Sequence, residues 1–88
     1  PDDYKLLANY PNPFNAATTI AFELPEACDV NLNIYNLAGR KVATLIEGYR
    51  EAGCHNINWD ASHYSSGIYF YKLSAGDKVF TKRMTLLK

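Results

Sequence analysis

The stretch SGIYFYKLSAGDKVFTKRMTLLK, residues 66–88, decides the fold of this chain. Its first part, from Gly67 to Leu73, is dense in aromatic and β-branched residues, which is the composition of a strand. A short Ala75-Gly76-Asp77 segment supplies turn residues, and a second strand-like run follows to the end of the sequence. We therefore predict a β-hairpin whose second strand is the last element of the chain.

Upstream of this hairpin, apolar residues recur with period two and no segment has a helical period. Glycine, proline and asparagine fall between the apolar runs, at 11–15, 25–26, 47–48, 52–53 and 60–67. The predicted strands are residues 4–8, 18–24, 30–35, 40–46, 54–59, 67–74 and 78–87.

About seven short strands with regular turns predict an all-β, immunoglobulin-like, two-sheet antiparallel sandwich. We expect strands 4–8, 18–24 and 54–59 in one sheet and the other four strands in the second. The expected core lies between the inner faces of the two sheets. It comprises Ile20, Phe22, Leu24, Val30, Leu32, Ile34, Val42, Ile57 and Trp59.

The length of 88 residues is enough for one domain and too short for two. We expect residues 1–88 to form a single domain, in which residues 1–8 are either a linker or the first edge strand. No apolar run approaches the ~20 residues that span a bilayer, so we expect no transmembrane segment. The chain begins at Pro1 and shows no N-terminal export signal, so we expect it to be a piece of a longer protein.

Nine basic and nine acidic side chains cancel, which argues against nucleic acid as a partner. Basic residues nevertheless crowd the final strand, where Lys78, Lys82, Arg83 and Lys88 face only Asp77. Two interpretations stay open. The cations discourage edge-to-edge aggregation, or they form a basic recognition strip.

Two cysteines, Cys28 and Cys54, open predicted strands that start at the same end of the sandwich. A disulfide between them would stabilise the domain by roughly 3–4 kcal/mol and would indicate an oxidising compartment. The alternative is two free, half-buried thiols that never meet.

No catalytic or metal-binding constellation is recognisable, so we expect neither an enzyme nor a cofactor. His55 shares a strand phase with Ile57 and Trp59, which favours packing over a ligand role. Asp60 and Ser62 are better placed for a local Asx-type turn than for a catalytic triad. The two cysteines lack the paired spacing of a zinc site.

Aromatic residues are in surplus, and strand alternation predicts where some of them point. If Lys72 faces water, Tyr69, Tyr71 and Leu73 face the core, while Ile68 and Phe70 face outward. Tyr35 is out of phase with Ile34 and would also point outward. This predicts an exposed apolar patch of Tyr35, Ile68 and Phe70, unless the N-terminal segment covers it.

Three separated stretches resemble one family. They are NYPNPFN (residues 9–15, followed by Thr18-Thr19-Ile20), IYNLAGRKV (residues 34–42) and SGIYFYKL (residues 66–73). In this order they resemble the C-terminal sorting domain of cargo proteins exported by the type IX secretion system. The family overlaps in sequence with the immunoglobulin-like domain of flagellar hook-capping proteins.

The resemblance implies a non-catalytic targeting function. An N-terminal signal on the precursor would deliver it to the periplasm, and an outer-membrane secretion machinery protein would recognise the folded domain. The cargo domains, N-terminal in the same precursor, would then be secreted or attached to the cell surface. The motif positions carried over are Pro11, Pro13, Gly39, Arg40, Gly67, Tyr69, Lys72, Lys82 and Lys88.

Within this set, the prolines and glycines have structural reasons to be present, and Tyr69 is expected in the core. Pro11 and Pro13 fix an extended path, Gly39 suits a turn with positive φ, and Gly67 suits a close backbone approach. Packing explains the basic residues less well. The recognition candidates are therefore Arg40, Lys72, Lys82 and Lys88, together with Tyr35, Ile68 and Phe70.

Two other functions remain open on the sequence alone. The chain could be a structural spacer or assembly module of a surface protein. The tyrosines and the sandwich form would also suit a carbohydrate-binding module, which needs exposed aromatic rings on one face.

Overall fold

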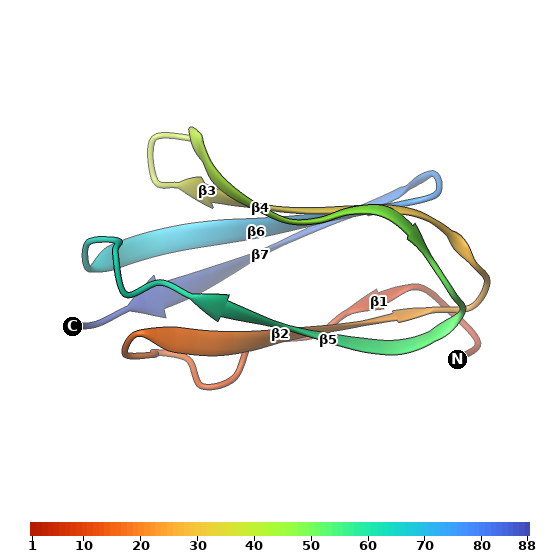
Figure 1. The fold of residues 1–88 in the computed structure, drawn as a ribbon, viewed down its shortest axis with the longest axis horizontal. Coiled ribbons are helices and arrows are strands. Elements are labelled where there is room, and N and C mark those ends of the chain that lie inside the picture. Colours follow the sequence, from red (N-terminus) through yellow and green to blue (C-terminus); the bar gives the residue numbers. More distant parts are fainter.

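The computed structural model describes every residue from Pro1 to Lys88, and its seven strands form two antiparallel sheets packed face to face (Figure 1). The three-stranded sheet has the order β1-β2-β5, and the four-stranded sheet has the order β4-β3-β6-β7. The strands are β1 (Lys5–Leu6), β2 (Ala17–Leu24), β3 (Cys28–Asn36), β4 (Lys41–Arg50), β5 (Gly53–Asp60), β6 (Gly67–Ala75) and β7 (Lys78–Leu86). This confirms the predicted all-β sandwich and the predicted division of strands between the sheets. No helical segment of the fold reaches the length and apolarity that crossing a bilayer demands.

Alternation of side chains places the core between the sheets. On β6, Tyr69, Tyr71 and Leu73 are buried, as predicted. All predicted core residues are buried except Val42 and Ile57, which are half-buried. The core also takes in apolar residues that the sequence pattern had not singled out, namely Leu6, Phe14, Ile46, Ala61, Ala75, Met84 and Leu86.

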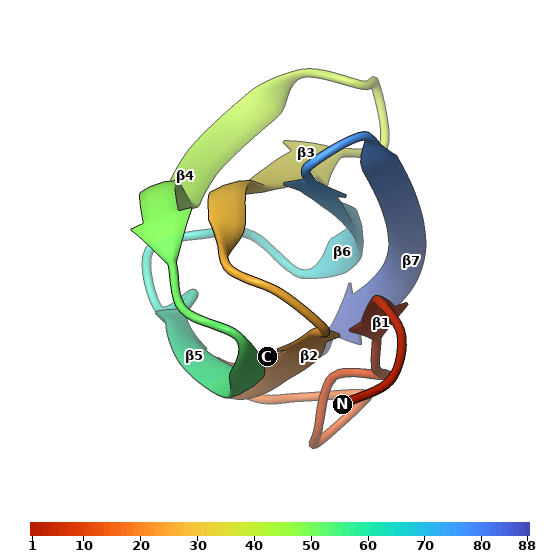
Figure 2. The same cartoon turned by 90° about the vertical axis from the view of Figure 1, so that its right-hand side faces the viewer.

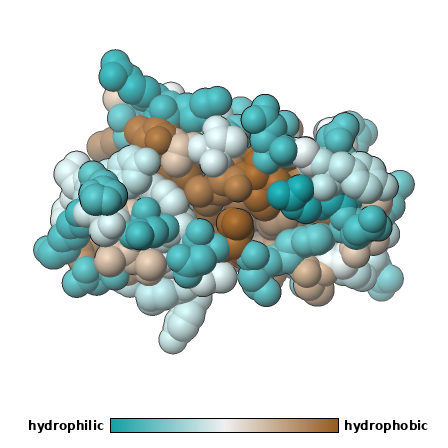
Figure 3. Space-filling model, viewed as in Figure 1, coloured by the Kyte–Doolittle hydropathy of each residue, from teal (hydrophilic) through white to brown (hydrophobic).

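Val42 and Ile57 are only half-buried because β4 and β5 are both edge strands. The two strands border the same open side of the sandwich, as Figure 2 shows. Apolar side chains are visible along the middle of this side in Figure 3, between the upper and lower sheets. Two irregularities in the β3–β4 register lie beside Val42 and Leu45, so this edge is not a regular ladder.

One predicted turn is wrong. Residues 47–48 were expected to end a strand, yet β4 continues to Arg50. The reason is the ladder with β3, in which Val30 pairs with Gly48 and Cys28 pairs with Arg50. Cross-strand pairing therefore holds Gly48 in the strand with a φ of 143°.

The predicted disulfide is not formed, because both cysteines are free thiols in the structure. Cys28 is half-buried and packs against the core from β3, whereas Cys54 is exposed on β5. Cys28 has the inward phase of Val30 on β3, whereas Cys54 has the outward phase of β5, opposite to Trp59. Their Cβ atoms therefore point in different directions, which a bridge does not allow. The inference of an oxidising compartment therefore has no support from these residues. Burial, with nearby Glu26 and Asp29, raises the pKa of the Cys28 thiol.

Two glycines show why the chain needs them. Gly39 has a φ of 85° and its N–H donates to the carbonyl of Asn36, as expected for a tight β3–β4 turn. Gly67 also has a positive φ, 154°. A Cβ at Gly67 would meet nothing within 4 Å, so the predicted close backbone approach there is wrong and the backbone conformation is what favours glycine.

Candidate functional site

A row of four side chains crosses the outer face of the four-stranded sheet near its β3–β4 turn. Lys41, Tyr35, Phe70 and Arg83 are successive cross-strand partners on β4, β3, β6 and β7. Cross-strand partners have their side chains on the same face, so this row presents two aromatic rings between two cations. We call these four residues the outer row.

Lys72 lies beside the outer row, two residues after Phe70 on the same face of β6. Its ammonium lies 5.7 Å from the centre of the Tyr35 ring, within the range of a cation–π interaction. Lys72 therefore contacts one of the two aromatic rings of the row. Lys41 was not among the recognition candidates, and Arg83 was named only with the other cations of the final strand. The hairpin register places Arg83 opposite Phe70 and so in the outer row.

The predicted apolar patch is assembled but only half-exposed. Tyr35 and Phe70 are direct partners, and Ile68 lies two residues from Phe70 on the same face of β6. All three side chains are of intermediate burial rather than exposed. The exposed tyrosines, Tyr10 and Tyr49, lie on different sheets and do not extend the patch.

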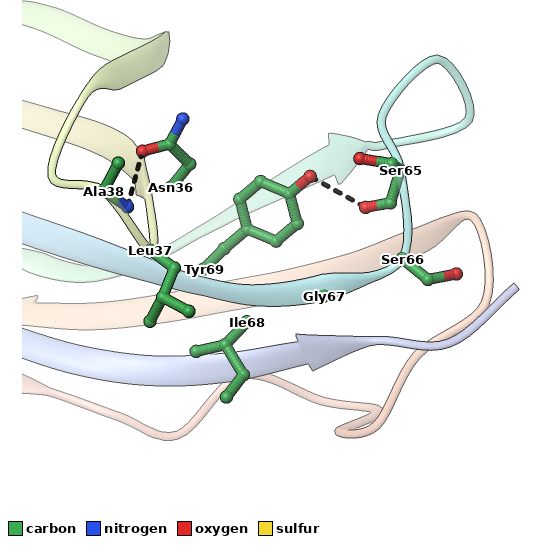
Figure 4. A pocket seen from close by; sticks show the side chains of 8 residues that line it. All are labelled: Asn36, Leu37, Ala38, Ser65, Ser66, Gly67, Ile68 and Tyr69. Atoms are coloured by element: carbon green, nitrogen blue, oxygen red, sulfur yellow. Dashed lines mark hydrogen bonds between the residues drawn. The ribbon is translucent and has the colours of Figure 1, made fainter.

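A hollow of about 300 Å³ opens beside this patch, at the same end of the sandwich (Figure 4). One wall is the β3–β4 turn, from Asn36 to Ala38, and the other is the chain from Ser65 to Tyr69. The Asn36 side chain accepts hydrogen bonds from the N–H groups of Ala38 and Arg40, which shapes the turn. The Tyr69 hydroxyl donates to the carbonyl of Ser65 and fixes the opposite wall.

The last residues of the chain are bound by a segment far away in sequence. The N–H of Phe14 donates to the carbonyl of Thr85 at 3.0 Å, and the N–H of Leu87 donates to the carbonyl of Phe14 at 2.9 Å. The Asn12 side chain accepts a bond from the N–H of Thr85 at 3.0 Å. We call this contact of residues 12–14 with residues 85–87 the terminal clasp.

Phe14 anchors the terminal clasp in the core. Its side chain is buried and lies against Trp59, with ring centres 6.0 Å apart. Trp59 in turn contacts Tyr64 and Tyr69, at 5.2 and 5.6 Å between ring centres. Aromatic pairs at these separations add to the stability given by burial alone. The clasp and the wall of the hollow therefore share one aromatic cluster.

Lys88 is held by the loop that precedes β6. Its N–H donates to the Ser66 hydroxyl at 3.0 Å, and its ammonium donates to the carbonyl of Ser62. The same loop contains the predicted Asx turn, in which the Asp60 carboxylate accepts the N–H of Ser62. That hydrogen bond lowers the pKa of Asp60.

The other predicted recognition residues are not gathered into one site. Arg40 is exposed in the β3–β4 turn, at the same end as Lys88. Lys82 pairs with Tyr71 and so has the inward phase of β7, where it is exposed at the edge of the sandwich. His55, expected to be a packed residue, stacks on Phe22 at 5.1 Å between ring centres.

The acidic side chains gather towards one end of the long axis of the molecule, which measures 37 Å. Every acidic side chain except Asp60 lies in the half that holds the N-terminus, before β1, in its turns or on the strands near them. The opposite half ends in the β3–β4 turn, the loop before β6 and the C-terminus. We call that half the basic end, and its cations are Arg40, Lys41, Arg83 and Lys88.

The hollow, the clasp and the held C-terminus lie at one end of the sandwich. No three His, Cys, Asp or Glu side chains come together as a metal site would require. Asn12, Phe14 and Ser66 lie inside the quoted family motifs but were not singled out as candidates. Their contacts are with residues 22 or more positions away, and the motifs do not show these partners.

Comparison with known proteins places residues 8–86 in one family, described as "Secretion system C-terminal sorting domain". Among solved structures, the chain is similar to PorZ, described as an essential bacterial surface component of the type-IX secretion system of Porphyromonas gingivalis. The TM-score is 0.64 at 18% sequence identity, over 99% of this chain and 12% of that chain. This likeness shows the fold, and the chain spans about an eighth of the PorZ chain. No curated protein matches the sequence.

Proposed function

Because the chain belongs to the family of secretion-system C-terminal sorting domains, which target cargo proteins to type IX secretion, we propose that the export machinery recognises its basic end. Proteins that carry such a domain are secreted across the outer membrane to the cell surface or the medium. The finer steps are part of the proposal. The domain folds in the periplasm, binds an outer-membrane machinery protein without catalysing a reaction, and leads its cargo towards surface attachment.

The observation that carries this proposal is the meeting of three separate motifs at one end of the sandwich. The opening motif supplies the terminal clasp, and the central motif supplies one wall of the hollow. The closing motif supplies the other wall, and Lys88 is bound to it through Ser66. A fold needs none of these motifs to share a surface, whereas a recognition site does.

The position of the cargo also supports recognition at the basic end. A C-terminal sorting domain is preceded by its cargo, and the N-terminus of this chain lies at the opposite end from the C-terminus (Figure 1). The basic end therefore points away from the cargo and stays accessible. The separation of charge also favours one orientation as the domain approaches an acidic partner surface.

Charge reversal tests the proposal. A reporter with a periplasmic export signal is fused to this domain in a bacterium that has type IX secretion. The double variant Arg40→Glu and Lys88→Glu should accumulate in the periplasm, because both changes repel an acidic receptor at the basic end. The measurement is the fraction of reporter in the medium and on the cell surface.

The matched control is the double variant Lys5→Glu and Arg50→Glu, which makes the same charge change at the other end, outside β7. It should be exported like the unaltered fusion. Equal export of the two double variants would contradict recognition at the basic end. Failure of the unaltered fusion to leave the periplasm would contradict the sorting function itself.

A further inference from the structure

The free edge of β7 displays backbone groups with no partner. β7 pairs with β6 on one side and is the last strand of its sheet on the other. The terminal clasp shows which residues of β7 have their backbone groups on the free side. The N–H and carbonyl of Thr85 and the N–H of Leu87 form hydrogen bonds with residues 12 and 14, on the side away from β6. Backbone groups along an antiparallel strand point alternately to either side. The groups of Val79, Thr81 and Arg83 therefore point to the free edge.

This assignment is consistent with the rest of the ladder. The β6–β7 register is continuous from Gly67–Leu86 to Ala75–Lys78, so no bulge changes the phase between Thr85 and Val79. β1 approaches β7 from the other sheet without pairing with it (Figure 2). The stretch from Val79 to Arg83 thus offers the donors and acceptors that an added strand would use.

The molecule already docks an extended segment in this way. Phe14 forms a parallel bridge with Leu86 and exchanges two backbone hydrogen bonds with Thr85 and Leu87. The terminal clasp pairs with the end of the edge, and no backbone hydrogen bond joins the free side of the adjoining stretch to another segment. An added strand along residues 79–83 would continue the pairing that the clasp begins.

The side chains of this stretch specify the charge of the partner. Lys82 and Arg83 are exposed on opposite faces of β7, and no acidic residue lies on the strand. Cations on an edge discourage pairing with a second copy of the same basic strand. They favour an extended segment that carries acidic side chains on both of its faces.

We propose that the free edge of β7, residues 79–83, binds an extended acidic segment of a component of the export machinery as an additional strand. This inference rests on the proposed sorting function and adds a second contact to the one at the basic end. Recognition through the edge uses backbone groups, so it is compatible with sorting domains whose exposed side chains differ.

A proline substitution tests the edge directly. Thr81 has its N–H on the free side, so Thr81→Pro removes a donor that an added strand needs and leaves the β6–β7 bonds in place. We expect export of the reporter fusion to fall by about tenfold, as for the loss of one hydrogen bond at a binding surface. Thr81→Val keeps the N–H, loses the hydroxyl and should be exported normally.

Thermal unfolding of the purified domains shows whether Thr81→Pro keeps the fold. If Thr81→Pro folds and is exported like the unaltered domain, the edge proposal is overturned. Should that variant unfold, Lys82→Glu takes its place, with Arg50→Glu on the opposite edge strand β4 as the control of equal charge change. Lys82→Glu should lower export and Arg50→Glu should not, and equal export of these two would also overturn the proposal. If only the basic-end variants lose export, the edge proposal is overturned and the proposed function stands.

Discussion

Single polar residues in the core join the N-terminal segment to the hairpin. The Tyr71 hydroxyl donates to the carbonyl of Leu7 and accepts the N–H of Asn9, both at 2.9 Å. The Asn9 side chain donates to Thr18 and to the carbonyl of Pro11. Backbone groups that are removed from water need such partners. The Tyr71 hydroxyl supplies them for Leu7 and Asn9, where the N-terminal segment packs against the core.

Tyr71→Phe tests this role. The substitution keeps the ring and leaves the buried N–H of Asn9 and the partly buried carbonyl of Leu7 without this partner, so we expect a loss of about 1–3 kcal/mol in the free energy of unfolding. Urea denaturation at pH 7 measures it. A loss within experimental error would show that water replaces the hydroxyl.

The same residue predicts a response to alkaline pH. Burial raises the pKa of Tyr71 above the ordinary value of 10.0, because loss of solvent disfavours the charged phenolate more than the Asn9 N–H stabilises it. A group with a raised pKa contributes stability that is complete below the unfolded pKa and is lost as the pH rises through the folded pKa. The unaltered domain should therefore lose more stability above pH 10 than Tyr71→Phe does.

At the scale of elements, the terminal clasp makes the last strand depend on the opening motif. β7 is an edge strand, and its final residues would fray if Asn12 and Phe14 did not cover their outward N–H and carbonyl groups. The order of the C-terminus is thus set by residues more than 70 positions away. Truncation or substitution at either end should disturb the same surface.

Asn12→Ala isolates this contact. It removes the acceptor for the Thr85 N–H and keeps the anchor Phe14, so hydrogen exchange of the Thr85 amide should speed up by about fivefold, equivalent to one hydrogen bond of about 1 kcal/mol. Amide exchange followed by NMR is the measurement. Asn15→Ala, at an exposed asparagine outside the clasp, should leave the Thr85 rate unchanged. Similar rates in both variants would contradict the clasp.

At the scale of the whole molecule, the N-terminal segment belongs to the sandwich from about Tyr4 onward. Leu6 is buried and pairs with Phe22, and the N–H of Leu7 donates to the carbonyl of Ala21. Residues before Tyr4 are exposed and form no strand. Of the two interpretations of residues 1–8, we favour a first edge strand that follows a short exposed lead.

Two truncations distinguish these interpretations. Removal of residues 1–3 should leave the melting temperature unchanged. Removal of residues 1–8 takes away Leu6 and the carbonyl partner of Tyr71, so the melting temperature should fall by about 10–20 °C. Thermal unfolding by circular dichroism compares them. Equal melting temperatures would make the whole segment a linker.

Only parts of the candidate site could be predicted from the sequence. Alternation along β6 places Ile68 and Phe70 outside and Tyr71 inside, because neighbouring side chains on a strand point to opposite faces. The same reasoning misjudged exposure, since Tyr35 and Phe70 bury parts of each other as cross-strand partners. It also treated the cations as one group, whereas Lys72 and Lys82 lie on opposite faces of the four-stranded sheet.

The amino-acid sequence by itself determined the strands, their division into two sheets and the family motifs, because these follow from local periodicity, turn residues and short runs of specific residues. Tertiary structure alone decided that the motifs meet at one end, that Asn12 and Phe14 bind Thr85 and Leu87, and that Cys28 and Cys54 stay apart. The physical reason is that such contacts depend on the register and packing of strands distant in the chain, which no local pattern encodes.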